Sequence, residues 1–371
     1  INAKEFSGLK GNVKLTMKFH DIIDLNHPEK SLEKLNEAYE TKLDIRNLAF
    51  HSKQLPYPIH DIDLKAHLEG HLAKIDLCRL KVGRSDVSIL GYVSDIPAII
   101  HHTNIPVTTQ LTIESNRMDV SELSKSDASS KPKVDEEISY FKAQFKFITS
   151  ARAITESPTL PLGEFYIDNL YAKLKHYPHV LHDFHADVII RDDTFKVVDF
   201  TGQIDHSDFH FNGGLTNYNL WFEDKLNGNT TIDFQLNSNK LKLEDLLVYK
   251  GENFIPADYR HEELDDLKFH GNVALHFNHG LQSTDLKLDH FHARMKVHPL
   301  RIDRLDGRFH LENEHLVVKE MDAKIGNSDL HLDMNYYLGD NQTLKIRDNL
   351  IHFKSQRLDV DQLVNYTEQA P

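Results

Sequence analysis

The sequence predicts an all-β protein: an elongated, curved, mostly antiparallel sheet of about fifteen strands, forming a groove with an apolar concave face. Three observations predict it. Apolar and polar residues alternate with a period of two, and short turn signals separate the alternating runs. The whole pattern also occurs three times, at a period of about 121 residues. Units repeated at a fixed period stack and share one continuous hydrophobic surface, so we expect one elongated body.

Landmark residues recur at matching positions in the three copies. Pro56, Pro178 and Pro299 set the alignment. An apolar residue precedes each proline and a Ser-Asp pair follows it, at Leu48, Leu170 and Phe291 and at Ser85-Asp86, Ser207-Asp208 and Ser328-Asp329. Each copy closes with a small polar residue and an alternating run that ends in leucine, at 115–123, 238–246 and 355–363. The predicted repeats span 1–124, 138–250 and 267–371, joined by polar linkers at 125–137 and 251–266.

Each copy is expected to contain about five strands, each with one apolar and one wet face. Phe141, Phe145 and Phe147, for example, alternate with lysine and glutamine. This pattern is typical of antiparallel sheet. Outside the strands, we expect a short helical pattern within 27–40, a loop at 150–163 and one or two helical turns at the closing motifs.

The apolar face requires a cover, because each exposed large side chain forfeits roughly 1.5–3 kcal/mol. The sheet could fold over as a sandwich, a second chain could cover it, or it could form a trough for acyl chains. In the trough, large apolar residues of the alternating runs would line the groove. These residues are Val13, Leu15, Met17, Phe19, Ile62, Leu64, Leu68, Phe141, Phe145, Phe147, Phe184, Val188, Phe209, Phe211, Ile232, Phe234, Leu236, Val273, Leu275, Phe277, Phe309, Leu311, Leu330 and Leu332.

Composition excludes several classes of function. The net charge of −14 argues against a nucleic-acid partner, which needs a basic face, and gives no general attraction to anionic membranes. No apolar run is long enough for a transmembrane helix, and we expect any membrane anchor to lie upstream of Ile1. Cys78 is the single cysteine and lies in an apolar strand pattern, so we expect a buried, inert thiol.

No catalytic, metal or cofactor site is predicted. Histidines such as His290 and His292 share a strand face, but most histidines fall on polar strand positions, which favours a solvated face over a metal site. The Ser-Asp neighbours point to opposite faces of a strand, so we expect them to act in turns or at strand starts. HExxH, GxSxG and Walker motifs are absent from the sequence. Pairs of acidic residues are so numerous that no single pair can be identified as the two carboxylates of a glycosidase. A carbohydrate-active β-repeat enzyme is therefore the weakest of the three hypotheses.

The repeating strands resemble the β-groove of bridge-like lipid-transfer proteins. The closing motif at 350–364 resembles the segment that ends the C-terminal region of AsmA-like proteins of the Gram-negative envelope. The middle copy departs from this motif, with Lys242 where the others have Asp119 and Asp359. The resemblance implies a periplasmic body tethered to the inner membrane by an anchor outside this fragment. It also implies phospholipid or another acyl-chain lipid as partner, and a role in phospholipid movement or outer-membrane maintenance.

We therefore expect a non-enzymatic lipid-binding or lipid-transfer segment, in which acyl chains lie on the apolar face and headgroups stay in water. The alternative is a structural or adhesive all-β repeat protein with a self-packed interior and no ligand. Both hypotheses predict the same apolar positions. They differ in whether the apolar side of the sheet stays open.

Overall fold

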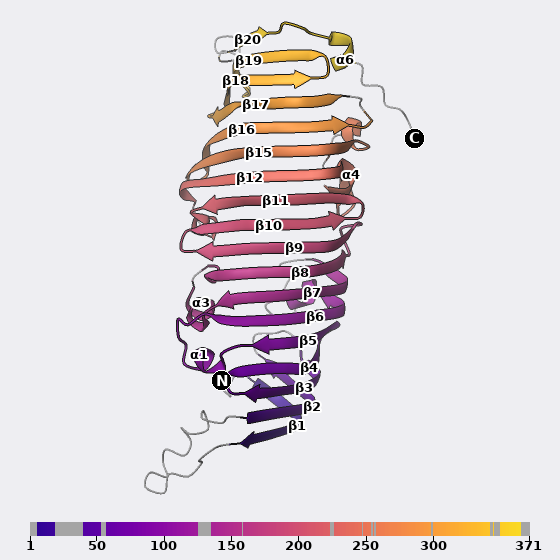
Figure 1. Ribbon diagram of the computed structural model, residues 1–371, viewed down its shortest axis with the longest axis vertical. Helices are drawn as coiled ribbons and strands as arrows, with labels where there is room; N and C mark the ends of the chain where they lie inside the picture. The colour runs from indigo at the N-terminus through magenta and orange to yellow at the C-terminus, as the bar shows by residue number, and fades with distance from the viewer. Residues whose placement is uncertain are drawn as a thin grey trace. The chain divides into compact units, whose positions relative to one another are not determined.

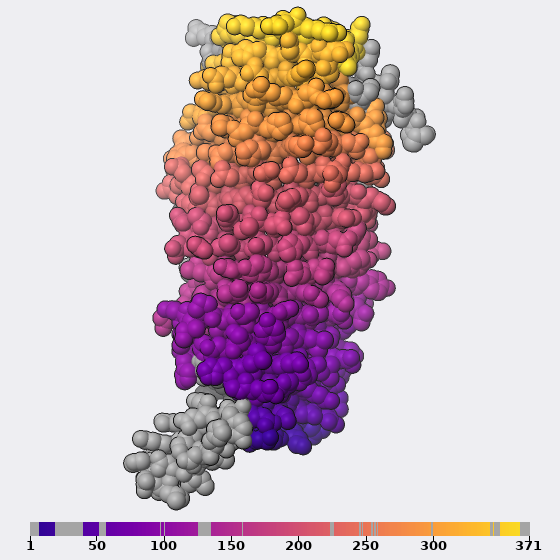
Figure 2. All heavy atoms as spheres, in the orientation of Figure 1, coloured from indigo at the N-terminus to yellow at the C-terminus, as the bar shows by residue number. Residues whose placement is uncertain are grey.

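The computed structural model describes residues 6–18, 40–52, 57–124, 135–157, 159–222, 226–246, 248–253, 255, 257–297, 300–341, 344 and 349–364. Eighteen strands form an open antiparallel sheet that is not closed into a barrel (Figure 1). This confirms the predicted all-β antiparallel class. The strands follow one another in chain order, as the unbroken colour series within each unit shows (Figure 2). The chain divides into two units, residues 1–185 and 186–371, which are described separately.

In the first unit each strand pairs antiparallel with the next along the chain, from β1–β2 to β7–β8. The strands are β1 (Phe6–Lys18), β2 (Glu40–Ser52), β3 (Ile59–Glu69), β4 (Leu72–Val82), β5 (Ser85–Val93), β6 (Val107–Asp119), β7 (Glu137–Thr149) and β8 (Gly163–Leu174), and the unit ends within β9 (Val180–Arg191). Its helices are α1 (Ile96–Ile100), α2 (Val120–Leu123) and α3 (Ala151–Glu156).

Helix α3 corrects the loop expected at 150–163. The Ser150 side chain caps the helix by accepting a hydrogen bond from the Ala153 amide at 3.1 Å. A favourable cap and a run of helix-compatible residues therefore outweigh the prolines that follow. The helical pattern expected within 27–40 and most of the linker expected at 125–137 lie outside the described residues.

The second unit continues the same pattern of antiparallel neighbours. Its strands are β10 (Thr194–Ile204), β11 (Ser207–Thr216), β12 (Asn227–Lys242), β15 (Glu263–Asn278), β16 (Leu281–Met295), β17 (Arg301–Glu312), β18 (His315–Ile325), β19 (Ser328–Tyr337) and β20 (Leu350–Lys354). A small hairpin of β13 (Val248–Tyr249) and β14 (Glu252–Asn253), two 3₁₀ helices, η3 (Tyr218–Phe222) and η4 (Ala257–Tyr259), and the helices α4 (Leu243–Leu246) and α6 (Val360–Val364) complete it.

Among the described residues, each sequence repeat contributes six strands to the large sheet, one more than the approximate number expected: β1–β6, β7–β12 and β15–β20. In the third copy the additional strand is β20, which opens the closing motif and pairs with β19. The expected linker at 251–266 is also shorter than predicted. Strand β15 begins at Glu263, because its ladder with β12 extends to the pair Lys242↔Glu263. Polar residues at a strand end hid this pairing from the hydrophobic pattern.

The repeated Ser-Asp pair lies where two paired strands separate, and we call this point the fork. The β5–β6 ladder ends at the pair Ser88↔Glu114, whereas β6 continues along β7. The β6 amides beyond the fork therefore face side chains of β5 instead of its backbone. Ser85 Oγ accepts from the Asp119 amide at 2.8 Å, and the Asp86 carboxylate accepts from the Arg117 amide at 2.8 Å. These side chains replace the missing ladder bonds.

The same fork occurs in the other two copies. Ser207 accepts from the Lys242 amide at 3.0 Å, and Ser328 accepts from the Asp359 amide at 2.9 Å. The aspartates that follow accept amide hydrogen bonds from Lys240 at 2.8 Å and from Gln356 at 2.7 Å. All three serines are at most 1% exposed. The expected turn or strand-start role of the Ser-Asp pairs is therefore a specific one, since each pair anchors the closing motif of its own repeat.

The closing motif then turns into a short helix, and its aspartate caps that helix. Asp119 accepts from the Glu122 amide at 2.9 Å, and Asp359 accepts from the Gln362 amide at 3.1 Å. Lys242 carries no acceptor, so the middle copy forms α4 without this cap. The departure from the motif at Lys242 thus has a local structural consequence.

Removal of the Asp86 carboxylate is expected to destabilise the first unit. In Asp86→Ala, the amides of Asn116 and Arg117 lose an acceptor, at a cost of about 1–3 kcal/mol. Burial opposes ionisation of Asp86, but the hydrogen bonds from Arg117 and Asn116 outweigh it and place its pKa below the usual value. The contribution is therefore full above a pH of about 4 and is lost as the pH falls through the lowered pKa. Urea unfolding of both proteins at neutral and acidic pH measures this difference, and an equal midpoint at neutral pH would contradict it.

Candidate functional site

The first unit presents a continuous apolar face. Directly paired residues form one row across its eight complete strands, and a second row runs beside it from β1 to β7. We call these rows the unit 1 apolar face. The rows are Leu15, Leu43, Ala66, Ile75, Gly91, Leu111, Phe145 and Ile167, and Val13, Ile45, Leu64, Cys78, Ile89, Ile113 and Ala143.

The second unit repeats this arrangement. One apolar residue from each strand pairs directly with an apolar residue of the next, from β10 to β20. We call this row, together with the residues on the same side of these strands, the unit 2 apolar face. The row is Phe195, Leu215, Ile232, Val273, Leu286, Phe309, Val318, Met334 and Ile351. Strands of two successive sequence repeats thus form one continuous apolar row within each unit.

These faces are only partly shielded from solvent. At the β1 edge Leu15 is 57% exposed, and at the β20 edge Ile351 is 57% exposed. Every other residue of the two long rows is half-buried, except Val318, which is buried. In a sandwich, such inward-facing residues would form a dry core about 10 Å thick. Among the described residues, the exposure pattern matches an open face and not a self-packed interior.

Aromatic residues lie directly opposite glycines on the unit 2 apolar face. Phe234 pairs with Gly213 on one side and Gly271 on the other. Its ring centroid lies 4.8 Å from that of Phe269. A Cβ atom on Gly271 would lie 3.0 Å from the Phe234 ring, so the ring occupies the space above the glycine. Large and absent side chains therefore alternate along this row, and aromatic rings fill the space above Gly213 and Gly271.

Short helices border the unit 2 apolar face at both strand ends. At one end Leu246 of α4 packs on the cluster of Leu241, Leu267 and Ala293. At the other end, the Trp221 ring of η3 packs edge to face against the Phe277 ring, with the two ring centroids 5.8 Å apart. The indole nitrogen of Trp221 donates a hydrogen bond to the Thr230 hydroxyl. The open part of β12 between Thr230 and Leu236 spans about 20 Å. This width is sufficient for hydrocarbon chains lying across the strands.

The opposite face of the sheet is polar, and its histidines pair with aspartates on neighbouring strands. His67 contacts Asp76 at 2.6 Å, His310 contacts Asp285 at 2.7 Å and His331 contacts Asp322 at 2.8 Å. These histidines therefore lie on the wet face, as expected, and the pairing is an addition to that expectation. No group of three or more metal-ligating side chains occurs in the described ranges.

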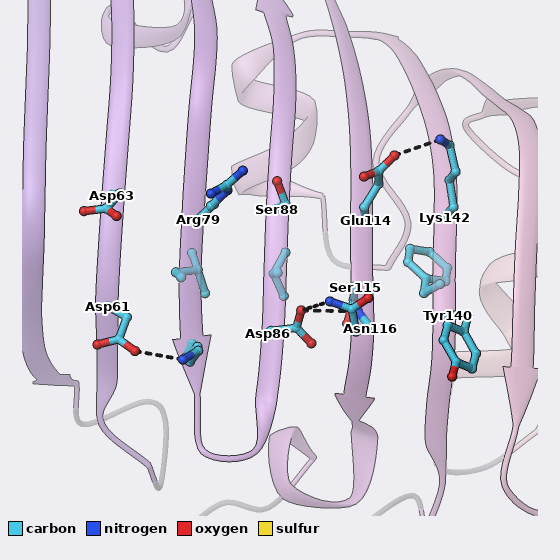
Figure 3. Close-up of a pocket in the computed structure, with 14 residues that line it drawn as sticks. Asp61, Asp63, Arg79, Asp86, Ser88, Glu114, Ser115, Asn116, Tyr140 and Lys142 are labelled. Carbon is cyan, nitrogen blue, oxygen red and sulfur yellow. Dashed lines mark hydrogen bonds and ion pairs between the residues drawn. The ribbon is translucent and has the colours of Figure 1, made fainter.

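A shallow hollow of about 690 Å³ lies on the polar face of the first unit (Figure 3). Successive strands line it with Asp63, Arg79, Ser88, Glu114 and Lys142, and Glu114 pairs with Lys142 at 2.8 Å. Both signs of charge are interspersed there. The residues follow the cross-strand register and do not converge on one point, so the hollow supports no nucleophile–base arrangement.

The structure places most of the predicted lining residues on the two apolar faces, on alternate positions of their strands. Phe19 lies outside the described residues. Phe184 and Val188 lie on β9. His185 on the same strand contacts Asp168 on the polar side of the sheet, and strand alternation places Phe184 and Val188 on the opposite, apolar side. Ile62 and Phe277 are buried, the latter beneath Trp221, so they form borders of the faces and not open surface.

Sequence reasoning missed several contributors to the faces. Strands β2, β4, β5, β16 and β18 all take part, and the glycines at 91, 213 and 271 allow a close approach of neighbouring atoms that hydrophobicity does not signal. Cys78 is half-buried within the unit 1 apolar face, where burial raises the pKa of its thiol. This agrees with an unreactive cysteine, although it is less enclosed than expected.

Comparison of the chain with protein-family models, curated proteins and solved structures found no match. None of the described helices is long and apolar enough to cross a bilayer. The candidate site is an open apolar sheet face in each unit, and short helices border it in the second unit.

Proposed function

We propose that the protein binds acyl-chain lipids on its apolar faces and acts as a lipid-transfer segment. The observation that carries the proposal is the continuous apolar row in each unit, half-buried along most of its length and exposed at its edge strand. Such a surface is unstable in water unless an apolar partner covers it, and a lipid chain is a partner without a fixed length or sequence. The proposal is non-enzymatic, and it requires no cofactor.

Acyl chains would lie on the apolar faces, with headgroups toward water. Each methylene removed from water contributes about 0.8 kcal/mol, so affinity should rise with chain length. The long rows carry no charged residue, and the proposal therefore includes broad tolerance of headgroups. We further propose a periplasmic location, a tether to the inner membrane, and a role in phospholipid movement or outer-membrane maintenance. These last points rest on the resemblance of the closing motif to AsmA-like proteins.

The test is the lipid content of the protein, purified without strong detergent from a membrane-containing lysate. Organic extraction and mass spectrometry should recover phospholipid in near-stoichiometric amounts. A delipidated sample should then take up fluorescent phospholipid from donor vesicles and deliver it to acceptor vesicles. Absence of lipid from the purified protein, together with no transfer above the protein-free rate, would favour a structural or adhesive repeat protein and overturn the proposal.

A further inference from the structure

One strand end of the first unit carries a cluster of exposed isoleucines. The connection from β5 to β6 contains α1, and the connection from β7 to β8 contains α3, and both lie at this end (Figure 1). Ile105 is 54% exposed and Ile154 is 61% exposed, and Ile99 is also exposed. We call residues 95–106, 150–157 and 159–162 together the α1–α3 tip.

The tip is a built structure and not two independent loops. Arg152 donates its amide to the carbonyl of Thr103 at 3.5 Å, and Ile96 donates its amide to the carbonyl of His71 in the β3–β4 turn at 3.1 Å. Ala98 and Ala151 are buried within it. The small residues face inward while the isoleucines face solvent, which is the reverse of what folding stability alone favours.

The charges of the tip suit a phospholipid surface. Its two carboxylates are engaged locally: Asp95 accepts from the Ala98 amide at 3.1 Å, and Glu156 lies 3.3 Å from Arg152. The exposed residues beside the isoleucines include His101 and His102. The chain as a whole carries a net charge of −14, which anionic lipids would repel. The tip is thus a place where a bilayer can approach without an uncompensated carboxylate.

The corresponding connection of the second repeat has the same character. Between β11 and β12, η3 buries Tyr218 and Leu220 but leaves Trp221 45% exposed and Phe222 55% exposed. Tryptophan at such a position is typical of the membrane–water interface, where its amphipathic ring meets both phases, and the adjacent phenylalanine adds a purely apolar ring. Two equivalent connections of the repeat therefore expose large apolar side chains.

We propose that the α1–α3 tip docks on the surface of a phospholipid bilayer by inserting Ile99, Ile105 and Ile154 between headgroups. This would bring the strand ends of the first unit to the membrane. Docking of this kind is shallow and reversible, because a few side chains enter the interface and no segment spans it. The proposal goes beyond lipid binding on the apolar faces and does not depend on it.

The test is flotation of the full chain with vesicles of phosphatidylcholine, whose headgroup carries no net charge and so does not repel a chain of net charge −14. The double variant Ile99→Asp/Ile154→Asp should bind about tenfold less protein to vesicles than the unaltered chain. Leu90→Asp is the matched control, because Leu90 is an exposed apolar residue of the same unit that lies outside the tip. Circular dichroism on heating should show the same melting for all three proteins, since the substituted side chains are exposed.

Two further readouts separate this proposal from lipid binding on the apolar faces. The tip variant should keep its co-purified lipid, and Phe234→Asp, on the unit 2 apolar face, should still float with vesicles. Equal flotation of the tip variant and the unaltered chain would overturn the proposal, as would no flotation of the unaltered chain. A loss in Leu90→Asp as large as that in the tip variant would also overturn it.

Discussion

Phe234→Asp is expected to remove most of the lipid bound to the second unit. Phe234 is the only large side chain between Gly213 and Gly271 in its row, so its ring supplies the local contact for a hydrocarbon chain. Loss of such a ring from an apolar site costs roughly 1.5–3 kcal/mol, which corresponds to a tenfold or greater loss of affinity. The carboxylate adds to this, because it would have to give up water under an acyl chain.

The neighbouring residue provides the control. Gln235 follows Phe234 on the same strand, is exposed, and pairs with His270 on the other face of the sheet. Gln235→Asp places the same charge one residue away without touching the apolar face. Lipid extraction and quantitative mass spectrometry of both variants, with circular dichroism to establish that each is folded, compare the two faces. Equal lipid content in two folded variants would contradict the proposed site, and unfolding of Phe234→Asp alone would favour a dry core.

The fold class followed from alternation, and the reason is physical. A strand with one wet and one apolar face leaves a period of two in the sequence, and runs such as 141–147 carried that signal clearly. Strand β20 was harder to assign, because it is five residues long and follows a polar connection. Helix α3 was missed for the opposite reason: the cap at Ser150 is a local hydrogen bond, whereas the prolines nearby were the more visible signal.

The candidate site was predictable only in part. Alternation identified which residues share a face, but not whether that face is open, since covered and open faces have the same pattern. The placement of Gly213 and Gly271 opposite Phe234 depends on cross-strand register, which a single sequence does not specify. The tip around Ile99 and Ile154 was likewise not identified, because isolated apolar residues in connections resemble ordinary loop composition.

A buried glutamate before the third repeat shows how a polar side chain fixes the start of a repeat. Glu262 is 1% exposed, and its Oε1 accepts amide hydrogen bonds from Glu263 at 3.1 Å and from Lys296 and Val297 at 2.8 Å each. Glu136 plays the same role before the second repeat, where it accepts from the amides of Lys175 and His176 at 2.8 and 3.1 Å. Each carboxylate thus ties the start of a repeat to the turn that follows its second strand.

Glu262→Ala is therefore expected to destabilise the second unit by about 3 kcal/mol or more, because three amides lose their acceptor at a buried position. Glu244→Ala is the control, since Glu244 lies in the same connection but is exposed. Its carboxylate makes only a long contact, at 3.8 Å, with Nδ1 of His261. Hydrogen exchange at the Lys296 and Val297 amides, followed by mass spectrometry, should accelerate in the first variant and not in the second. Because a chain of ladder-paired strands depends on each junction, the urea midpoint should fall together with this protection. Unchanged exchange in Glu262→Ala would mean that the β12–β15 ladder alone fixes the start of the repeat.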